Sequence, residues 1–162
     1  MSITGLRYAD RLGPNGTLTL IPRSWQALQR FWEGWRLSNK YARQGLDAMT
    51  LEELRKFVDS LLWQKRHEKA KHVIETAFNK KDLPDDTRVI LWVLLMKTYA
   101  GSSKACKKMS EGGKQKFISA KRWYVRAAKE VNNSKLKPTV RAYVLDALAE
   151  FDLERNKYRA AR

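Results

Sequence analysis

The stretch VILWVLLM, residues Val89–Met96, is the longest apolar run in this chain of 162 residues. Eight consecutive apolar side chains leave no polar stripe, so the element they form must be covered by protein on all sides. The run is far shorter than the roughly 20 residues that a membrane-spanning helix needs. We therefore expect a helix over about residues 86–99 at the centre of the molecule, and no membrane span.

The segments on both sides of this run carry further helix signals. Thr50 and Glu53 form a capping box, which predicts a helix beginning at Thr50. The apolar periodicity lapses over residues 64–67 and then resumes, so we expect a break between two helices there. Pro138 suits the first turn of a last helix. The patterns predict an all-α bundle of about six helices, covering about residues 24–43, 50–63, 68–80, 86–99, 114–131 and 138–159.

Residues 1–23 differ from the rest of the chain because glycine and proline interrupt them repeatedly. The segment TLTLI within them alternates as a strand would, but no second run of that kind is available to pair with it. We interpret residues 1–23 as an extended N-terminal arm and residues 24–162 as a single α-helical domain. The domain comprises an aromatic and basic helix, a helical core, a basic loop and C-terminal helices, over residues 24–45, 50–100, 101–113 and 114–162.

The charge of the chain is strongly positive, with 33 Lys and Arg against 17 Asp and Glu, a formal net charge of +16. Residues 1–45 carry +5 and residues 101–141 carry +10, whereas the remaining segments are almost balanced. A lysine-rich solvated surface would spread the charge more evenly. Two separate basic blocks favour a polyanionic partner, and nucleic acid is the simplest one.

The first basic block lies on the predicted helix SWQALQRFWEGWRLSNKYAR, residues 24–43. At helical spacing, Trp25, Trp32 and Trp35 form a stripe, and Arg36, Lys40 and Arg43 lie along its edge. The indoles could dock on the bundle with the cations at its border, or stack on exposed bases. We favour a helix placed between two partners, with its indoles on protein and its cations on phosphate.

The second basic block covers the predicted loop and the helix after it, where few acids are available to pair with the cations. Flexible lysines near glycines suit phosphate oxygens, which demand charge without a fixed geometry. A solvated loop and helix face remains the alternative. The residues of this block are Lys104, Lys107, Lys108, Lys114, Lys116, Lys121, Arg122, Arg126 and Lys129.

Enzyme, metal and cofactor signatures are weak, so we expect a protein that is not an enzyme and needs no cofactor or metal. His67 and His72 lie five residues apart and cannot converge as an i, i+4 zinc pair would. Cys106 is the only cysteine, which excludes an internal disulfide and a cysteine-based zinc site. No signal-peptide core is evident at the N-terminus, and we expect a soluble protein.

The layout resembles the major capsid proteins of filamentous archaeal viruses with linear double-stranded DNA, the lipothrixvirus and tristromavirus kind. The resemblance is carried by the arm from Gly5 to Arg23, the helix from Ser24 to Arg43 and the helices that follow. It implies helices that wrap A-like DNA, a virion location with assembly in the host cytoplasm, and a helical polymer in which the partner is another copy of the chain or a related capsid subunit. It places Arg30, Arg36, Lys40 and Arg43 on phosphates.

The composition and the resemblance together predict a sequence-independent nucleic-acid-binding protein that coats linear double-stranded DNA in a helical filament. The alternatives are a plasmid- or phage-encoded regulator that binds DNA or RNA, and a helical adaptor that binds acidic protein segments. Besides the residues of the second block, the predicted phosphate-binding cations include a set near the N-terminus: Arg23, Arg30, Arg36, Lys40 and Arg43.

The charge distribution predicts duplex binding with a steep salt dependence and little preference for sequence. Each phosphate contact should contribute roughly −0.9 to the slope of log K against log salt concentration. Binding of two unrelated duplexes of equal length, measured across a salt series, checks this expectation. A flat salt response would contradict it.

Overall fold

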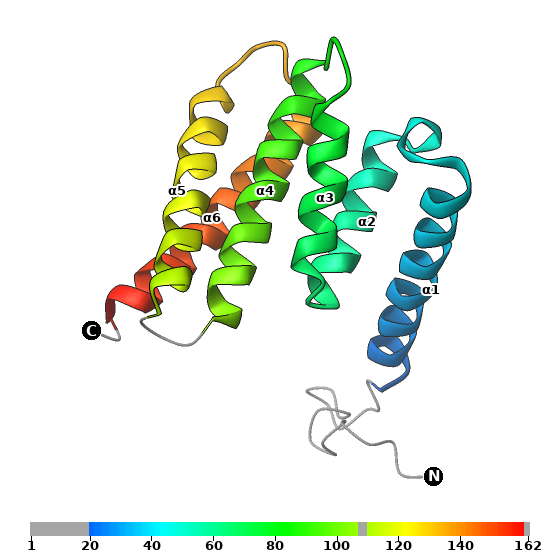
Figure 1. Cartoon of the computed structure of the whole chain (residues 1–162), viewed down its shortest axis with the longest axis horizontal. Coiled ribbons are helices and arrows are strands. Elements are labelled where there is room, and N and C mark those ends of the chain that lie inside the picture. The colour runs from blue at the N-terminus through cyan, green and yellow to red at the C-terminus, as the bar shows by residue number, and fades with distance from the viewer. Residues whose placement is uncertain (1–19, 107–109, 161–162) are drawn as a thin grey trace.

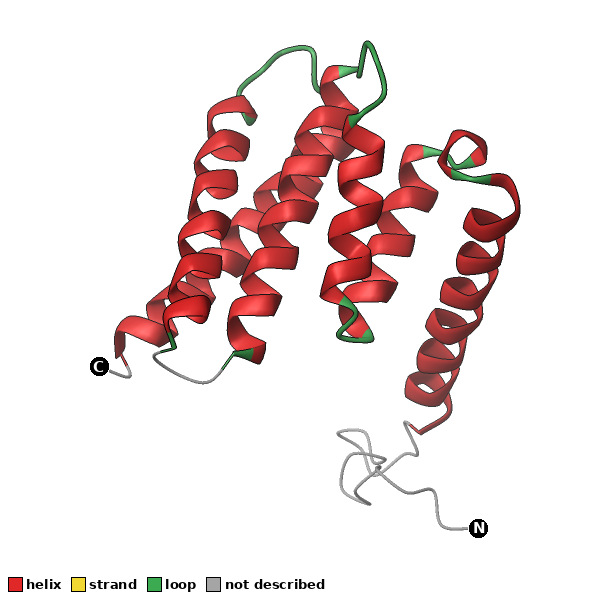
Figure 2. Ribbon diagram, in the orientation of Figure 1, coloured by secondary structure: helices red, strands yellow, loops and turns green. Residues whose placement is uncertain are grey.

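The computed structural model describes the backbone of residues 20–106 and 110–160, and side chains within residues 25–106 and 110–156. These residues form six α-helices and one short 3-10 helix, with no strand among them (Figures 1 and 2). The predicted all-α fold of about six helices is therefore confirmed. The helices are α1 (Leu20–Gln44), α2 (Leu51–Trp63), α3 (His67–Phe78), α4 (Asp85–Ala105), α5 (Glu111–Glu130) and α6 (Pro138–Ala160), and the 3-10 helix η2 is Leu46–Ala48.

Helix α4 is the centre of the fold, as its apolar run predicts. Between Val89 and Met96, every side chain is buried except that of Trp92, which is partly buried. Helices α2, α3, α5 and α6 all contact α4 and so cover it from several directions (Figure 1). None of the described helices combines the length and the apolarity needed to cross a membrane.

The C-terminal end of α4 differs from the prediction. We expected Gly101 to end the helix and residues 101–113 to form a loop, but α4 continues to Ala105 and α5 begins at Glu111. Gly101 lies at a helix contact instead, because a Cβ at this position would lie 2.9 Å from Cε1, at the tip of the His67 ring on α3. A glycine that allows two helices to approach closely has the same sequence signature as a helix stop.

The turn between α2 and α3 agrees with the predicted break. Helix α2 begins with Thr50 as its N-cap, and both hydrogen bonds of the capping box with Glu53 are formed. The chain reverses after Trp63 through Lys65, which adopts a positive φ of 61°. The lapse in the apolar stripe thus marks the residues that connect two packed helices.

Helix α1 begins earlier than predicted. It starts at Leu20, so residues 20–23 of the predicted arm are helical and Ser24 is not the N-cap. Pro22 is compatible with this start because the amides of a first helical turn need no intrahelical acceptor. The rest of the predicted arm, residues 1–19, lies outside the described residues. At the other end Gly45 adopts a φ of 74° and ends the helix, as expected.

Helix α1 packs on α2 and η2 at one edge of the molecule (Figure 1). Leu37 is fully buried, and the centre of the Tyr41 ring lies 5.2 Å from the centre of the Phe57 ring on α2. Gly34 is buried as well, and a Cβ there would lie 3.2 Å from Cβ of Ser60. The absence of a side chain at Gly34 therefore lets α1 lie close to α2.

Polar contacts connect helices α2, α4, α5 and α6 to one another. The ammonium of Lys97 on α4 donates to the Tyr143 hydroxyl on α6 at 3.2 Å and lies 3.6 Å from the Asp59 carboxylate on α2. Burial disfavours the charge of Lys97, but these two partners outweigh it and raise its pKa. The Tyr124 hydroxyl on α5 donates to Asp152 on α6 at 2.7 Å.

The close approach at Gly34 predicts that Gly34→Leu weakens the docking of α1. Overpacking of a filled site costs about 1–3 kcal/mol, and urea unfolding followed by circular dichroism measures the loss. Gly112→Leu is the matched control, because no atom lies within 4 Å of a Cβ at that helical position. Equal stability of the two variants would contradict the close packing of α1 on α2.

Candidate nucleic-acid interface

The outer face of α5 gathers the largest group of predicted phosphate-binding residues. Three small residues at seven-residue spacing, Gly113, Ala120 and Ala127, are buried and direct one side of α5 toward the bundle. The opposite side therefore faces outward, at the edge of the molecule far from α1 (Figure 1). The exposed cations on that side are Lys114, Lys121, Arg122, Arg126 and Lys129.

The five cations of this α5 face have no carboxylate within 4 Å in the described part of the chain. The two acids of the helix, Glu111 and Glu130, lie at its ends. Two cations rest on aromatic rings: Lys121 lies 5.0 Å from the centre of Phe117, and Arg126 lies 4.9 Å from that of Trp123. The face is therefore a positively charged surface that the described residues do not neutralise.

The basic block of α1 is different because α2 supplies acids to it. The Lys40 ammonium lies 2.9 Å from the Glu53 carboxylate, and the Arg36 guanidinium lies 3.8 Å from the same group. The hydrogen bond from Lys40, with that from the Thr50 amide, lowers the pKa of Glu53. Much of the charge predicted for phosphate thus contributes to docking α1 on α2. Arg30 and Arg43 remain exposed.

The tryptophans of α1 do not lie where the sequence predicted. Trp25, Trp32 and Trp35 are 59%, 57% and 55% exposed, so they do not dock on the bundle of their own chain. The side of α1 that packs on α2 carries Gly34 and Leu37 instead, roughly opposite the indole stripe on the helical wheel. The prediction that these indoles pack on this bundle is wrong, because the widest apolar stripe is not the one that docks.

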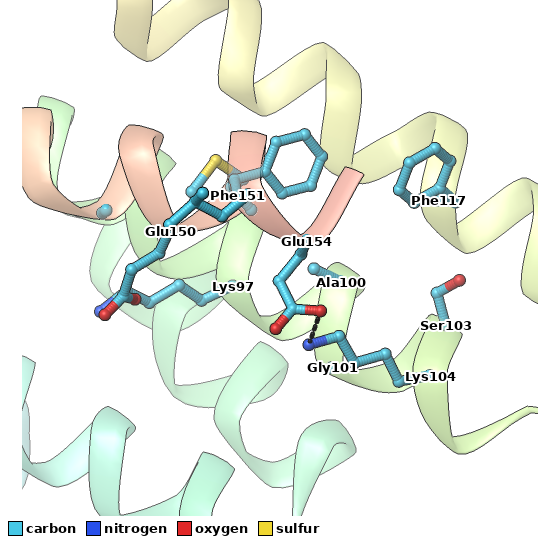
Figure 3. Close-up of a pocket in the computed structure, with 12 residues that line it drawn as sticks. Lys97, Ala100, Gly101, Ser103, Lys104, Phe117, Glu150, Phe151 and Glu154 are labelled. Atoms are coloured by element: carbon cyan, nitrogen blue, oxygen red, sulfur yellow. Dashed lines mark ion pairs between the residues drawn. The ribbon is translucent and has the colours of Figure 1, made fainter. Parts of the chain in front are cut away.

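Lys104 also has a partner that the sequence did not indicate. Its ammonium lies 2.9 Å from the Glu154 carboxylate of α6, and the pair borders a hollow of about 440 Å³ between α4 and α6 (Figure 3). Phe117 of α5 and Phe151 of α6 line the same hollow. Lys104 therefore links two helices and does not belong to the unpaired face of α5.

Lys116 points away from the α5 face and joins a second group of cations. Together with Lys65, Arg66 and Lys69 of the α2–α3 segment, it lines a shallow hollow around His67. Sequence reasoning missed these three because residues 46–100 are nearly neutral as a whole. The local signal was the run of basic residues within KRHEK, residues 65–69.

The environment of His67 reports this local positive charge. Burial lowers its pKa, and the nearby ammonium groups of Lys65 and Lys116 lower it further. Neither ring nitrogen has a hydrogen-bond partner within the described residues, and the ring packs on Gly101. The neutral form of His67 is therefore the one that the folded state favours.

Three of the predicted phosphate-binding residues, Arg23, Lys107 and Lys108, lie outside the residues whose side chains are described.

Among the described residues, no three His, Cys, Asp or Glu side chains are grouped to hold a metal ion.

Comparison with protein-family models, with curated proteins and with solved structures gave no significant match to this chain.

The lowered pKa of His67 predicts a loss of stability in acid. The unfolded chain binds a proton with a pKa near 6.5 and the folded chain binds it less readily, so the free energy of unfolding falls as the pH drops below about 6.5. Urea unfolding at pH 7.5 and pH 5.0 should show a smaller loss for His67→Gln than for the wild type. His72→Gln, at an exposed histidine, is the control and should behave as the wild type. The same loss in all three proteins would refute the assignment.

Proposed function

We propose that this protein binds the phosphate backbone of nucleic acid through the outer face of α5, without preference for base sequence. The observation that carries the proposal is the set of five exposed cations there, none of them within 4 Å of a carboxylate in the described chain. Such cations displace the counterions of a nucleic acid, and this release supplies sequence-independent affinity.

The chemistry of this face favours phosphate over base edges. Lys114 and Lys129 are separated by 15 residues, which is a rise of about 22 Å along the helix. The α5 face is therefore long enough to contact several phosphates. The exposed side chains between the cations include the apolar Ile118 and Val125. Base-specific contacts require hydrogen-bonding groups at fixed positions, and apolar side chains do not supply them.

We further propose that the protein is a capsid protein that coats linear double-stranded DNA in a filamentous virion. This proposal is supported by the resemblance to capsid proteins of filamentous archaeal viruses and by the positions of the two outer helices. Helix α5 lies at one edge of the molecule and α1 at the other (Figure 1). A subunit bound to DNA through α5 would keep α1 available for neighbouring subunits, as a coat requires.

Removal of three α5 cations tests the proposal. The variant Lys121→Gln, Arg122→Gln, Lys129→Gln should bind a linear duplex more weakly. The slope of log K against log salt should decrease in magnitude by about 0.9 for each phosphate that the variant no longer neutralises. A control with the same charge is Lys71→Gln, Lys80→Gln, Lys104→Gln, in which each replaced lysine has a carboxylate partner. The control should retain most of the wild-type slope.

Three results would contradict the proposal. Equal effects of the two triple variants would show that only the net charge matters. Strong preference for one of two unrelated duplexes would indicate a sequence-specific regulator. Binding of an acidic peptide but of no duplex at physiological salt would indicate an adaptor for acidic protein segments.

A further inference from the structure

Helix α1 carries the most extensive exposed apolar surface among the described residues. Five large apolar side chains on one side of it are about half exposed: Trp25, Leu28, Phe31, Trp32 and Trp35. They lie on the side of α1 away from Gly34 and Leu37, which pack on α2. Contiguous apolar surfaces of this kind mark contact sites with other molecules.

Four of these residues follow the spacing of a coiled-coil seam. Trp25, Leu28, Trp32 and Trp35 are separated by three, four and three residues, so they occupy alternating a and d positions of a heptad repeat. Their directions fall within about 80° around the helix. We call residues 25, 28, 32 and 35 the seam. The seam fits the side of another α-helix, because the side chains of a facing helix recur at the same spacing.

The seam also has an aromatic contact within it and an open hollow along it. The rings of Trp32 and Trp35 touch edge to face, with their centres 5.5 Å apart and their planes at 88°. The seam and its flanking residues Gln29, Glu33 and Arg36 border an open hollow of about 540 Å³. A side chain of a facing helix can enter such a hollow as a knob enters a hole.

We propose that the seam pairs with the seam of a second copy of this chain, with the two α1 helices antiparallel about a twofold axis near residue 30. In this register, Trp25 faces Trp35 of the second copy and Leu28 faces Trp32 of the second copy. Each a position then meets a d position, and Phe31 lies beside the axis. A twofold contact requires a surface that is complementary to itself, and in this register each apolar seam residue faces an apolar seam residue of the second copy.

The area of the seam is sufficient for such a dimer. A large aromatic side chain offers about 150–250 Å² for burial, so five side chains exposed by about half present on the order of 500 Å². Two copies would therefore bury on the order of 1,000 Å² in total, which reaches the lower limit for a specific interface. A pairing at this limit depends strongly on its central residues, Leu28 and Trp32.

The charges beside the seam favour a protein partner over nucleic-acid bases. Glu33 is paired with Lys56 at 3.1 Å, and the Arg36 guanidinium lies 3.8 Å from Glu53. Stacking platforms for single strands combine aromatic rings with cations that remain available for phosphates. The antiparallel order also separates the two copies of Arg43 by about 39 Å, which reduces repulsion between two chains of charge +16.

The pairing would supply one self-contact of the coat proposed above, but it uses α1 alone and requires no nucleic acid. The two proposals are distinguished by salt. High salt screens the repulsion between two basic chains and should maintain or tighten the dimer, whereas it weakens duplex binding.

Sedimentation equilibrium of the full chain in 0.5 M NaCl tests the pairing. The wild type, a chain of 18.9 kDa, should sediment with twice that mass. Trp32→Glu should weaken the dimer by at least about thirtyfold, as expected for a central aromatic contact. Because Trp32 is exposed in the single chain, the circular dichroism of the Trp32→Glu variant should match that of the wild type. The matched control is Trp63→Glu, which alters a tryptophan that is 60% exposed at the end of α2 and should leave the dimer intact.

Disulfide trapping tests the orientation. In a Cys106→Ser background, Gln29→Cys lies beside the twofold axis and should cross-link two chains on mild oxidation. Asn39→Cys should not, because the two copies of residue 39 are about 27 Å apart along the antiparallel axis. In a parallel pair, residue 39 would meet its own copy and the result would be reversed.

Other outcomes would overturn the pairing. A wild-type monomer at all concentrations would do so, as would a Trp32→Glu variant as dimeric as the wild type. If the wild type is monomeric and a chain lacking residues 1–19 dimerises, the N-terminal segment covers the seam instead. If the protein is monomeric and a single-stranded oligonucleotide quenches tryptophan fluorescence in the wild type but not in Trp32→Glu, bases occupy the seam.

Discussion

The central constraint on this fold is the exclusion of water from the middle turns of α4. Almost every side chain from Val89 to Met96 is buried, so α4 needs neighbours on all sides. Helices α2, α3, α5 and α6 provide them. Because these four helices occupy the surroundings of α4, α1 packs on α2 at one edge, and α5 forms the opposite edge with one side exposed (Figure 1).

The two edge helices dock by small residues, which leaves their larger side chains outside. Gly34 lets α1 approach α2, and Gly113, Ala120 and Ala127 do the same for α5 on the bundle. The outward sides then differ in chemistry. Helix α1 presents aromatic rings and α5 presents cations, and these two surfaces lie on opposite edges of the molecule. The arrangement can hold a polyanion on one edge and a protein on the other.

The pairing of charges across helices decides which basic residues remain available. Lys40 is 13 residues from Glu53, and Lys104 is 50 residues from Glu154, yet each pair lies within 3 Å. Counting acids near a cation in the sequence therefore overestimated the free charge of α1 and of Lys104. The same count was a better guide for α5, whose outer face has no acid supplied from another helix among the described residues.

The sequence by itself determined the elements: an all-α chain, the buried α4, the capping box at Thr50 and the turn near Lys65. These features depend on periodicity and capping, which are local and can be read along the chain. Only the tertiary structure decided what each helix turns toward its neighbours. Gly101 looked like a stop and is a packing contact with His67, and the indoles of α1 looked like core and lie outside. The physical reason is that burial depends on which surfaces fit together across helices: a glycine can bring two backbones close enough to dock, and a wide apolar stripe can remain exposed.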